Sequence, residues 1–125
     1  MKRIAAALLL SLSAACNSTD EPLLPCDEPV SITVSGAAPQ FAWQPACLVS
    51  RITVTDSIGT VLWDVQATGS SIPPAVPYGE LPDGATQLTA PVALIAGRSY
   101  AVGLYRATGV TPGDVELLSA VAFRP

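Results

Sequence analysis

Proline and glycine divide this 125-residue chain into short segments, and this division constrains the fold more than any other feature. The chain holds 12 prolines and 9 glycines, and turn signals recur at short spacing among β-branched residues. Residues 30–34 alternate cleanly, which places Val30, Ile32 and Val34 on one face of an expected strand. Because such segments favour strands over helices, the sequence predicts an all-β fold, and its length is enough for one domain.

Segments of strand character recur along the rest of the chain. After residues 30–34, we expect strands at 40–45, 48–55, 61–65, 100–105 and 115–123, with 86–94 leading into the strand at Tyr100. The side chains expected to face the core are those of Phe41, Trp43, Leu48, Ile52, Val54, Val61, Trp63, Val65, Val121 and Phe123. Residues 70–84 are rich in proline, and because proline donates no ladder hydrogen bond, we expect an edge or a loop there.

Two groups of residues resemble the fibronectin type III domain and related immunoglobulin-like β-sandwiches. Trp43 lies near the end of an expected strand and is followed two residues later by Pro45. The spacing Leu94-x-x-Gly97-x-x-Tyr100 resembles the tyrosine corner of those folds. The resemblance implies that Leu94 enters the core and that the Tyr100 hydroxyl hydrogen-bonds to the backbone just upstream. It also implies a single immunoglobulin-like, fibronectin type III-like antiparallel β-sandwich of about seven strands.

The N-terminus has the organisation of a bacterial secretion signal. Lys2 and Arg3 form a positive region, and the apolar stretch at residues 4–12 is much shorter than the roughly 20 residues of a transmembrane helix. Small residues then lead to Cys16, with Ser13 at the position where the family usually has an aliphatic residue. This pattern resembles the signal peptide and lipobox of bacterial lipoproteins, in which the cysteine is the first mature residue.

The lipoprotein resemblance implies that the chain is cut before Cys16 and that this residue carries lipid, which anchors the protein in a membrane. Asn17 favours the outer membrane by the sorting rule of enteric bacteria, so the expected location is the bacterial cell envelope. Loss of Lys2 and Arg3 changes the net charge from −4 to −6, which leaves no electrostatic attraction to anionic lipid. The alternative is an ordinary signal peptide cut after Ala15 or nearby, which leaves a soluble secreted protein.

Two cysteines are left once the resemblance assigns Cys16 to lipid. In an exported chain, Cys26 and Cys47 suggest a structural disulfide, and they lack the C-x-x-C spacing of a redox-active pair. The disulfide would close a loop of about 20 residues and contribute roughly 3 kcal/mol on the chain-entropy model.

The expected parts of the chain are a signal peptide at 1–15, a lipidated, acidic and proline-rich tether at 16–29, and the sandwich at 30–125.

Composition excludes several classes of function. The chain has no histidine, which removes histidine metal sites, Ser-His-Asp triads and Cys-His dyads. An acidic protein with six basic residues is a poor nucleic-acid binder, because neutralising phosphates needs clustered lysine and arginine. No motif pairs a nucleophile with a base, so we expect no catalytic residues, no metal site and no cofactor.

The best binding candidate is a proline-stiffened loop that carries Tyr78 and Glu80. An aromatic residue on such a loop loses little entropy on binding, but we favour the alternative that Tyr78 folds back over an edge of the sandwich. Trp63 also has two interpretations, a sugar-stacking platform or, as we favour, a core residue. We expect a non-catalytic binding or assembly module for an envelope protein or a glycan, which binds through end loops or strand edges. The alternative is a structural envelope protein without a specific ligand.

Overall fold

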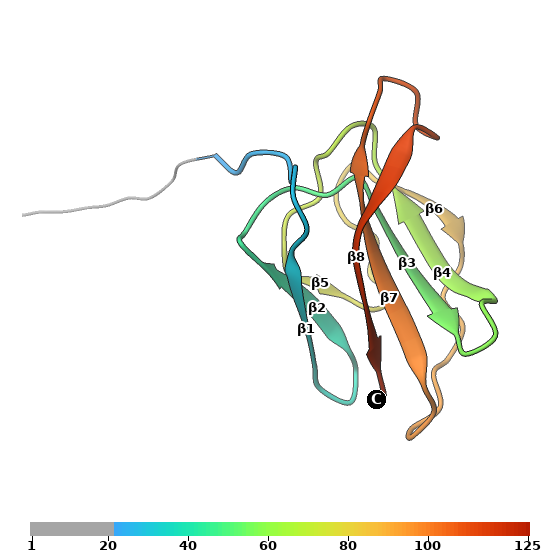
Figure 1. Ribbon diagram of the computed structural model, residues 1–125. Coiled ribbons are helices and arrows are strands. Elements are labelled where there is room, and N and C mark those ends of the chain that lie inside the picture. Colours follow the sequence, from blue (N-terminus) through green and yellow to red (C-terminus); the bar gives the residue numbers. More distant parts are fainter. Residues whose placement is uncertain (1–21) are drawn as a thin grey trace, which may run out of the picture.

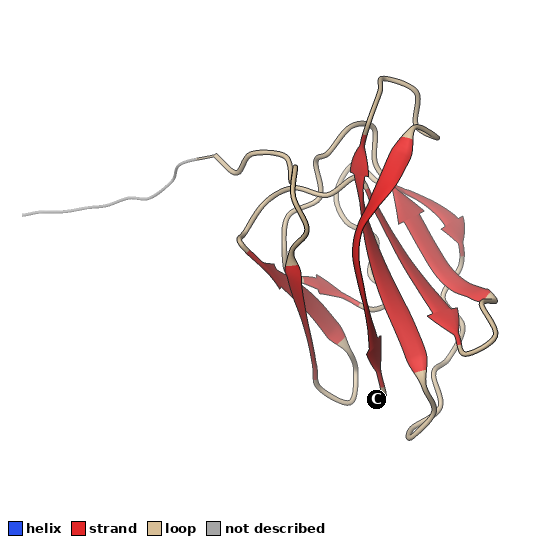
Figure 2. Ribbon diagram, viewed as in Figure 1, coloured by secondary structure: helices blue, strands red, loops and turns tan. Residues whose placement is uncertain are grey.

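The computed structural model describes residues 22–125, which form eight strands and no helix (Figure 1, Figure 2). The expected signal peptide and Cys16 lie outside the described residues. The strands in chain order are β1 (Ser31–Ser35), β2 (Gln40–Gln44), β3 (Arg51–Asp56), β4 (Val61–Gln66), β5 (Val76–Pro77), β6 (Thr86–Thr89), β7 (Tyr100–Ala107) and β8 (Val115–Phe123). The predicted all-β fold is confirmed, with eight strands where about seven were expected.

The strands form two antiparallel sheets that face each other as a sandwich. One sheet has the order β1-β2-β5, and the other has the order β6-β4-β3-β7-β8. Immunoglobulin-like sandwiches likewise place the first, second and fifth strands in one sheet, and the third strand with the last two in the other. Strands β4 and β6 extend the larger sheet beyond β3, on the side away from β8 (Figure 2).

The core lies between the two sheets and is built on their alternating side chains. Phe41 and Trp43 of β2, together with Trp63 of β4, are almost completely excluded from solvent. Phe41 meets Phe123 of β8 in an edge-to-face contact with ring centroids 5.5 Å apart. Burial of each such side chain stabilises the fold by roughly 1.5–3 kcal/mol or more. Trp63 therefore belongs to the core and presents no stacking platform to solvent.

Two residues expected in the core, Leu48 and Val61, lie outside it, and Val49 is buried where Leu48 was expected to be. Val61 is 40% exposed, although Trp63 and Val65 of the same strand are buried. The pairing of β3 with β4 shifts at this point, because Val54 pairs with Trp63 whereas Thr55 pairs with Val61. The extra residue on β4 forms a β-bulge, which breaks the alternation and separates Val61 from the face that carries Trp63.

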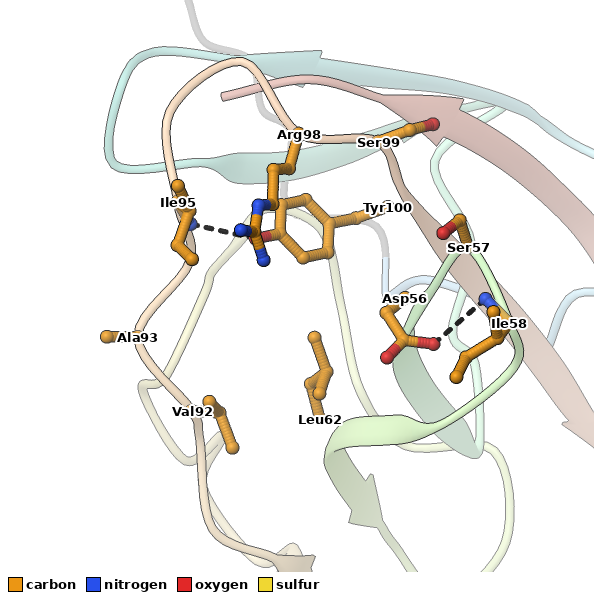
Figure 3. A pocket seen from close by; sticks show the side chains of 10 residues that line it. All are labelled: Asp56, Ser57, Ile58, Leu62, Val92, Ala93, Ile95, Arg98, Ser99 and Tyr100. Atoms are coloured by element: carbon orange, nitrogen blue, oxygen red, sulfur yellow. Dashed lines mark hydrogen bonds between the residues drawn. The ribbon is translucent and has the colours of Figure 1, made fainter.

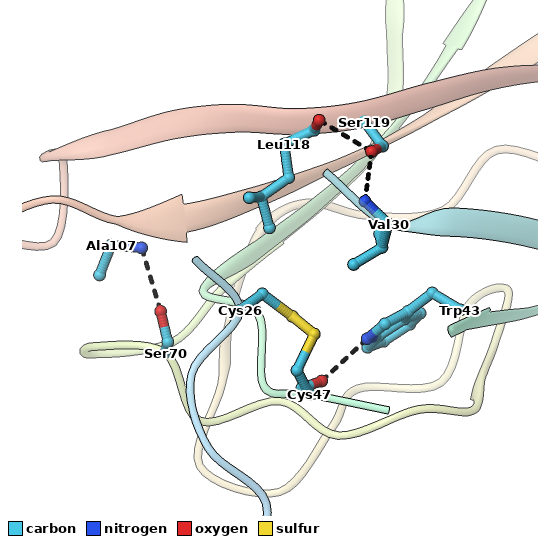
Figure 4. The surroundings of a disulfide bond; sticks show 8 residues. All are labelled: Cys26, Val30, Trp43, Cys47, Ser70, Ala107, Leu118 and Ser119. Carbon is cyan, nitrogen blue, oxygen red and sulfur yellow. Dashed lines mark hydrogen bonds between the residues drawn. A yellow bond between two sulfur atoms is a disulfide. The ribbon is translucent and has the colours of Figure 1, made fainter. Parts of the chain in front are cut away.

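The predicted disulfide between Cys26 and Cys47 is confirmed, and both residues are buried (Figure 4). It fastens a segment that we expected to be tether. The backbone N–H of Cys26 donates to the carbonyl oxygen of Leu48 at 2.8 Å, and the N–H of Leu48 donates to the carbonyl of Leu24 at 2.9 Å. The indole N–H of Trp43 also donates to the Cys47 carbonyl at 2.8 Å. Among the described residues, backbone bonds to the sandwich therefore start at Leu24, and Leu48 lies in this contact instead of in β3.

Candidate functional site

The turn that leads into β7 is held by the side chain of Tyr100. The Tyr100 hydroxyl accepts a hydrogen bond from the backbone N–H of Ile95 at 2.8 Å, and Leu94 packs against the core. Gly97 has a φ of +83°, a conformation that glycine adopts at no steric cost, and its N–H donates to the backbone oxygen of Pro125 at 3.0 Å. These contacts tie the backbone of residues 94–99 to the core and to Pro125, just after β8, at one end of the sandwich.

This loop forms one wall of a pocket of about 340 Å³, which we call the end pocket. Its other walls come from the turn that joins β3 to β4 and from the segment that follows β6 (Figure 3). Its lining residues are Asp56, Ser57, Ile58, Leu62, Val92, Ala93, Ile95, Arg98, Ser99 and Tyr100. Pockets for small ligands begin at roughly this size and combine apolar walls with a few polar groups.

The walls of the end pocket combine five aliphatic residues with the polar residues Asp56, Ser57, Arg98 and Ser99. Ile58, Val92 and Ile95 belong to the large apolar side chains that the described residues leave exposed, and the exposed fraction of Ile58 reaches 86%. Leu62 is half-buried and lies between them in Figure 3. Scattered exposed apolar residues need no explanation, but a group of them around one pocket marks a surface that can bind a partner.

Two charged residues line the end pocket, and their situations differ. Oδ1 of Asp56 accepts hydrogen bonds from the backbone N–H groups of Ile58 at 3.1 Å and Thr60 at 2.8 Å, so this carboxylate stabilises its own turn. Arg98 is exposed and reaches from the 94–99 loop toward the centre of the pocket in Figure 3. The ion pairs within residues 22–125 are Arg51–Asp64 and Arg106–Glu116, so Arg98 has no carboxylate partner in that part of the chain.

The loop residues predicted as a binding site, Tyr78 and Glu80, point to different surroundings. The Tyr78 ring packs edge-to-face on Trp63 with centroids 5.3 Å apart, and its hydroxyl donates to the carbonyl of Val92. Burial raises the pKa of the Tyr78 phenol above its usual value. Glu80 is exposed and lines a separate, proline-rich groove of about 500 Å³ beside β5. The structure therefore does not bring the two residues together as one binding surface.

Binding at strand edges, the second expected route, is disfavoured for the described sheets. The N–H of Tyr78, just after β5, donates to the carbonyl of Pro39, just before β2. Because backbone groups alternate sides along a strand, the nitrogen of Pro77, which carries no hydrogen, faces the open side of β5. β6 has only four residues, and its register against β4 is shifted. β8 is bulged against β7 and lies beside β1, where the N–H of Val30 donates to Oγ of Ser119 at 2.9 Å. Short, bulged and proline-bearing edges resist the addition of a further strand.

The end pocket lies far from the point where the chain joins the sandwich. Leu24 and Cys26 are bonded to Leu48, which precedes β3, whereas Asp56 and Ile58 follow β3. The six residues of β3 separate the two ends by roughly 20 Å, at about 3.3 Å for each residue. Figure 1 shows the same arrangement, with the N-terminal segment at the upper end and the turn after β3 at the lower end.

Sequence analysis did not single out the residues of this pocket, with the exception of Tyr100. They come from three loops that are distant in the sequence, and no motif joins them. The usable signal was the position of Arg98 inside the Leu94–Tyr100 pattern, because the bond from Ile95 to Tyr100 positions the backbone that carries Arg98. Within residues 22–125, no three Cys, Asp or Glu side chains gather closely enough to hold a metal ion.

Comparison of the chain with known protein families, curated proteins and solved structures finds no match. In the part of the chain that the structure describes, no helix has the length and apolar character needed to cross a bilayer.

Proposed function

We propose that this protein is a lipid-anchored lipoprotein of the bacterial cell envelope, whose β-sandwich is a non-catalytic binding module. The observation that carries the binding role is the end pocket, where exposed aliphatic side chains surround Arg98 at the end opposite to the tether. The anchoring role rests on the lipobox-like sequence at Cys16 and on the net charge of −6 without Lys2 and Arg3, which leaves attachment to lipid alone.

The geometry of attachment supports this division of roles. Seven residues lie between Cys16 and Leu24, the first of the described residues with a bond to the sandwich, and the eight residue steps span at most about 29 Å when fully extended. Lipid on Cys16 would therefore hold the end of the sandwich that carries Leu24 close to the membrane. The end pocket would face away from the membrane, where a partner can reach it.

The anchor is tested by expressing the full-length chain in a bacterium beside a Cys16→Ala control, followed by fractionation and intact mass measurement. We expect the wild-type chain in the membrane fraction with a lipid-sized mass gain, and the variant without that gain. A soluble chain cut near Ala15 in both strains would refute the anchor and support the secreted alternative.

The binding role is tested by photo-crosslinking in intact cells. Ile58 and Val110 suit a matched comparison, because both are aliphatic residues at hairpin turns, with 86% and 95% of their surface exposed, at opposite ends of the sandwich. A photoreactive residue at position 58 should give a discrete adduct with an envelope component, and the same group at position 110 should not. Equal patterns at the two positions, or no adduct at position 58, would refute the binding role and favour a purely structural protein.

A further inference from the structure

We infer that the end pocket binds a carboxylate carried on a branched aliphatic body, and specifically the C-terminal end of an apolar peptide segment. This inference rests on the proposed binding role and names the ligand that the same pocket takes. It follows from the charges, the apolar walls and the size of the pocket.

The charge of the ligand follows from the different situations of Arg98 and Asp56. The planar guanidinium of arginine matches a carboxylate through two parallel N–H···O bonds, and Arg98 has no such partner within the described residues. Oδ1 of Asp56 is already bonded to two backbone N–H groups. The lining therefore offers a guanidinium without a carboxylate partner and a carboxylate that is partly engaged in its own turn, and this difference favours an anionic group placed at Arg98.

The chemical character of the ligand's uncharged part follows from the side chains that line the end pocket. Ile58, Leu62, Val92 and Ile95 present aliphatic surface to the pocket. A sugar ligand would need an exposed aromatic face and several hydrogen-bonding groups. The only aromatic residue of the lining, Tyr100, is 5% exposed, and its hydroxyl is engaged by the N–H of Ile95. The pocket therefore favours branched aliphatic groups over a glycan.

The size of the pocket limits how much of a partner can enter. A volume of about 340 Å³ lies near the lower limit of roughly 300–1,000 Å³ for small-ligand sites. It suits one or two residues at the end of a chain and excludes a folded domain. At the end of a peptide chain, a carboxylate lies close to the last side chain. In the end pocket, the guanidinium of Arg98 can bind this carboxylate, and the aliphatic residues of the lining can contact the side chain.

The test compares N-acetyl-leucyl-leucine, which has a free carboxylate, with its amide, which has the same body without the charge. Binding is followed by NMR through the backbone signals of Ile95 and Arg98. The protein is used as it is purified from the bacterium, and if it carries lipid it is placed in nanodiscs of zwitterionic lipid. We expect the acid to bind at least about fivefold more tightly than the amide, and this ratio should fall as salt is added. 4-Methylpentanoate serves as a third probe. It should bind more weakly than N-acetyl-leucyl-leucine if the natural ligand is a peptide, and as tightly if the natural ligand is a free carboxylic acid.

Two variants separate charge from apolar contact. Arg98→Gln should abolish the difference between acid and amide, whereas Arg124→Gln, an equal charge change at an exposed residue outside the lining, should preserve it. Ile95→Ser should weaken both probes equally, and an unchanged near-ultraviolet circular dichroism spectrum shows that each variant is folded. Equal binding of acid and amide, no binding of either, or loss of discrimination in Arg124→Gln would overturn the carboxylate ligand. The crosslinking comparison of positions 58 and 110 would still decide the binding role separately.

Discussion

The hydroxyl of Tyr100 accepts a hydrogen bond from the backbone N–H of Ile95, and this contact joins the core of the sandwich to the wall of the end pocket. The Tyr100 ring is buried beside Phe123 with centroids 5.9 Å apart, so its position is set by the core. The loop of residues 94–99 is therefore positioned by a core residue, and Arg98 is carried on that loop.

Tyr100→Phe should destabilise the protein by about 1 kcal/mol or more, because the partly buried N–H of Ile95 loses its acceptor. For a domain of this size, the melting temperature should fall by roughly 4–8 °C for each kcal/mol. Tyr105→Phe is the matched control, since among residues 22–125 the Tyr105 hydroxyl has only a long contact of 3.5 Å to Oγ1 of Thr53. Equal melting temperatures of the wild type and Tyr100→Phe would show that the hydroxyl does not stabilise the turn.

The core was predictable from the sequence wherever strand alternation was regular. Phe41 and Trp43 lie on a strand without interruption, and both are buried as expected. Val61 was placed in the core because the pattern around it also alternates, and the bulge at Leu62 has no marker in the sequence. Alternation describes the two faces of a strand, so it fails where a strand gains an extra residue.

The end pocket was beyond prediction for a different reason. Asp56 and Arg98 look alike in the sequence, as charged residues near a glycine. Only the structure shows that Asp56 is bonded within its own turn while Arg98 has no partner within residues 22–125. Tyr78 was also ambiguous, because its inward position depends on contact with Trp63, which is distant in the chain. A local pattern cannot decide contacts between loops that meet only after folding.

Cys26→Ser should lower the melting temperature in oxidising buffer, because the disulfide joins the N-terminal segment to Cys47, next to Leu48. The chain-entropy model gives a loss of roughly 3 kcal/mol for a loop of this length. Cys47→Ser should have the same effect, and a reductant should reduce the melting temperature of the wild type to that of the variants. Equal melting of wild type and variants without reductant would contradict a stabilising disulfide.

Asp64→Asn should destabilise the protein more than Glu116→Gln does. Asp64 is 5% exposed and forms two bonds with Arg51, at 2.9 Å to Nε and 2.6 Å to Nη2. The hydrogen bond with Asp64 raises the pKa of Arg51, although burial opposes the shift. Removing one partner leaves a half-buried guanidinium uncompensated, at a cost of about 2–4 kcal/mol.

Glu116 provides the matched control for this change. It pairs with Arg106 at 2.9 Å on the surface, where the loss of an ion pair costs about 0–1 kcal/mol. Urea unfolding of the two variants measures both effects directly. Similar midpoints for Asp64→Asn and Glu116→Gln would show that the buried position of Asp64 adds nothing to the strength of its pair.

Alkaline conditions should destabilise the protein partly through Tyr78. Burial raises the pKa of this phenol in the folded state, whereas the unfolded chain has the ordinary value of about 10. The folded protein therefore holds this proton more tightly than the unfolded chain does. The resulting stability is fully present below about pH 10 and is lost as the pH rises through the folded-state pKa.

Tyr78→Phe isolates this effect, because Tyr100 and Tyr105 titrate in both proteins. The variant should be less stable at neutral pH, since it lacks the hydrogen bond to Val92 and its ring still packs on Trp63. Above pH 10, its free energy of unfolding should fall less steeply than that of the wild type, by up to about 1.4 kcal/mol for each pH unit. Urea unfolding between pH 8 and pH 11.5 measures the two slopes. Parallel curves would mean that the Tyr78 phenol ionises as readily in the folded protein as in the unfolded chain, and would place its hydroxyl in contact with solvent.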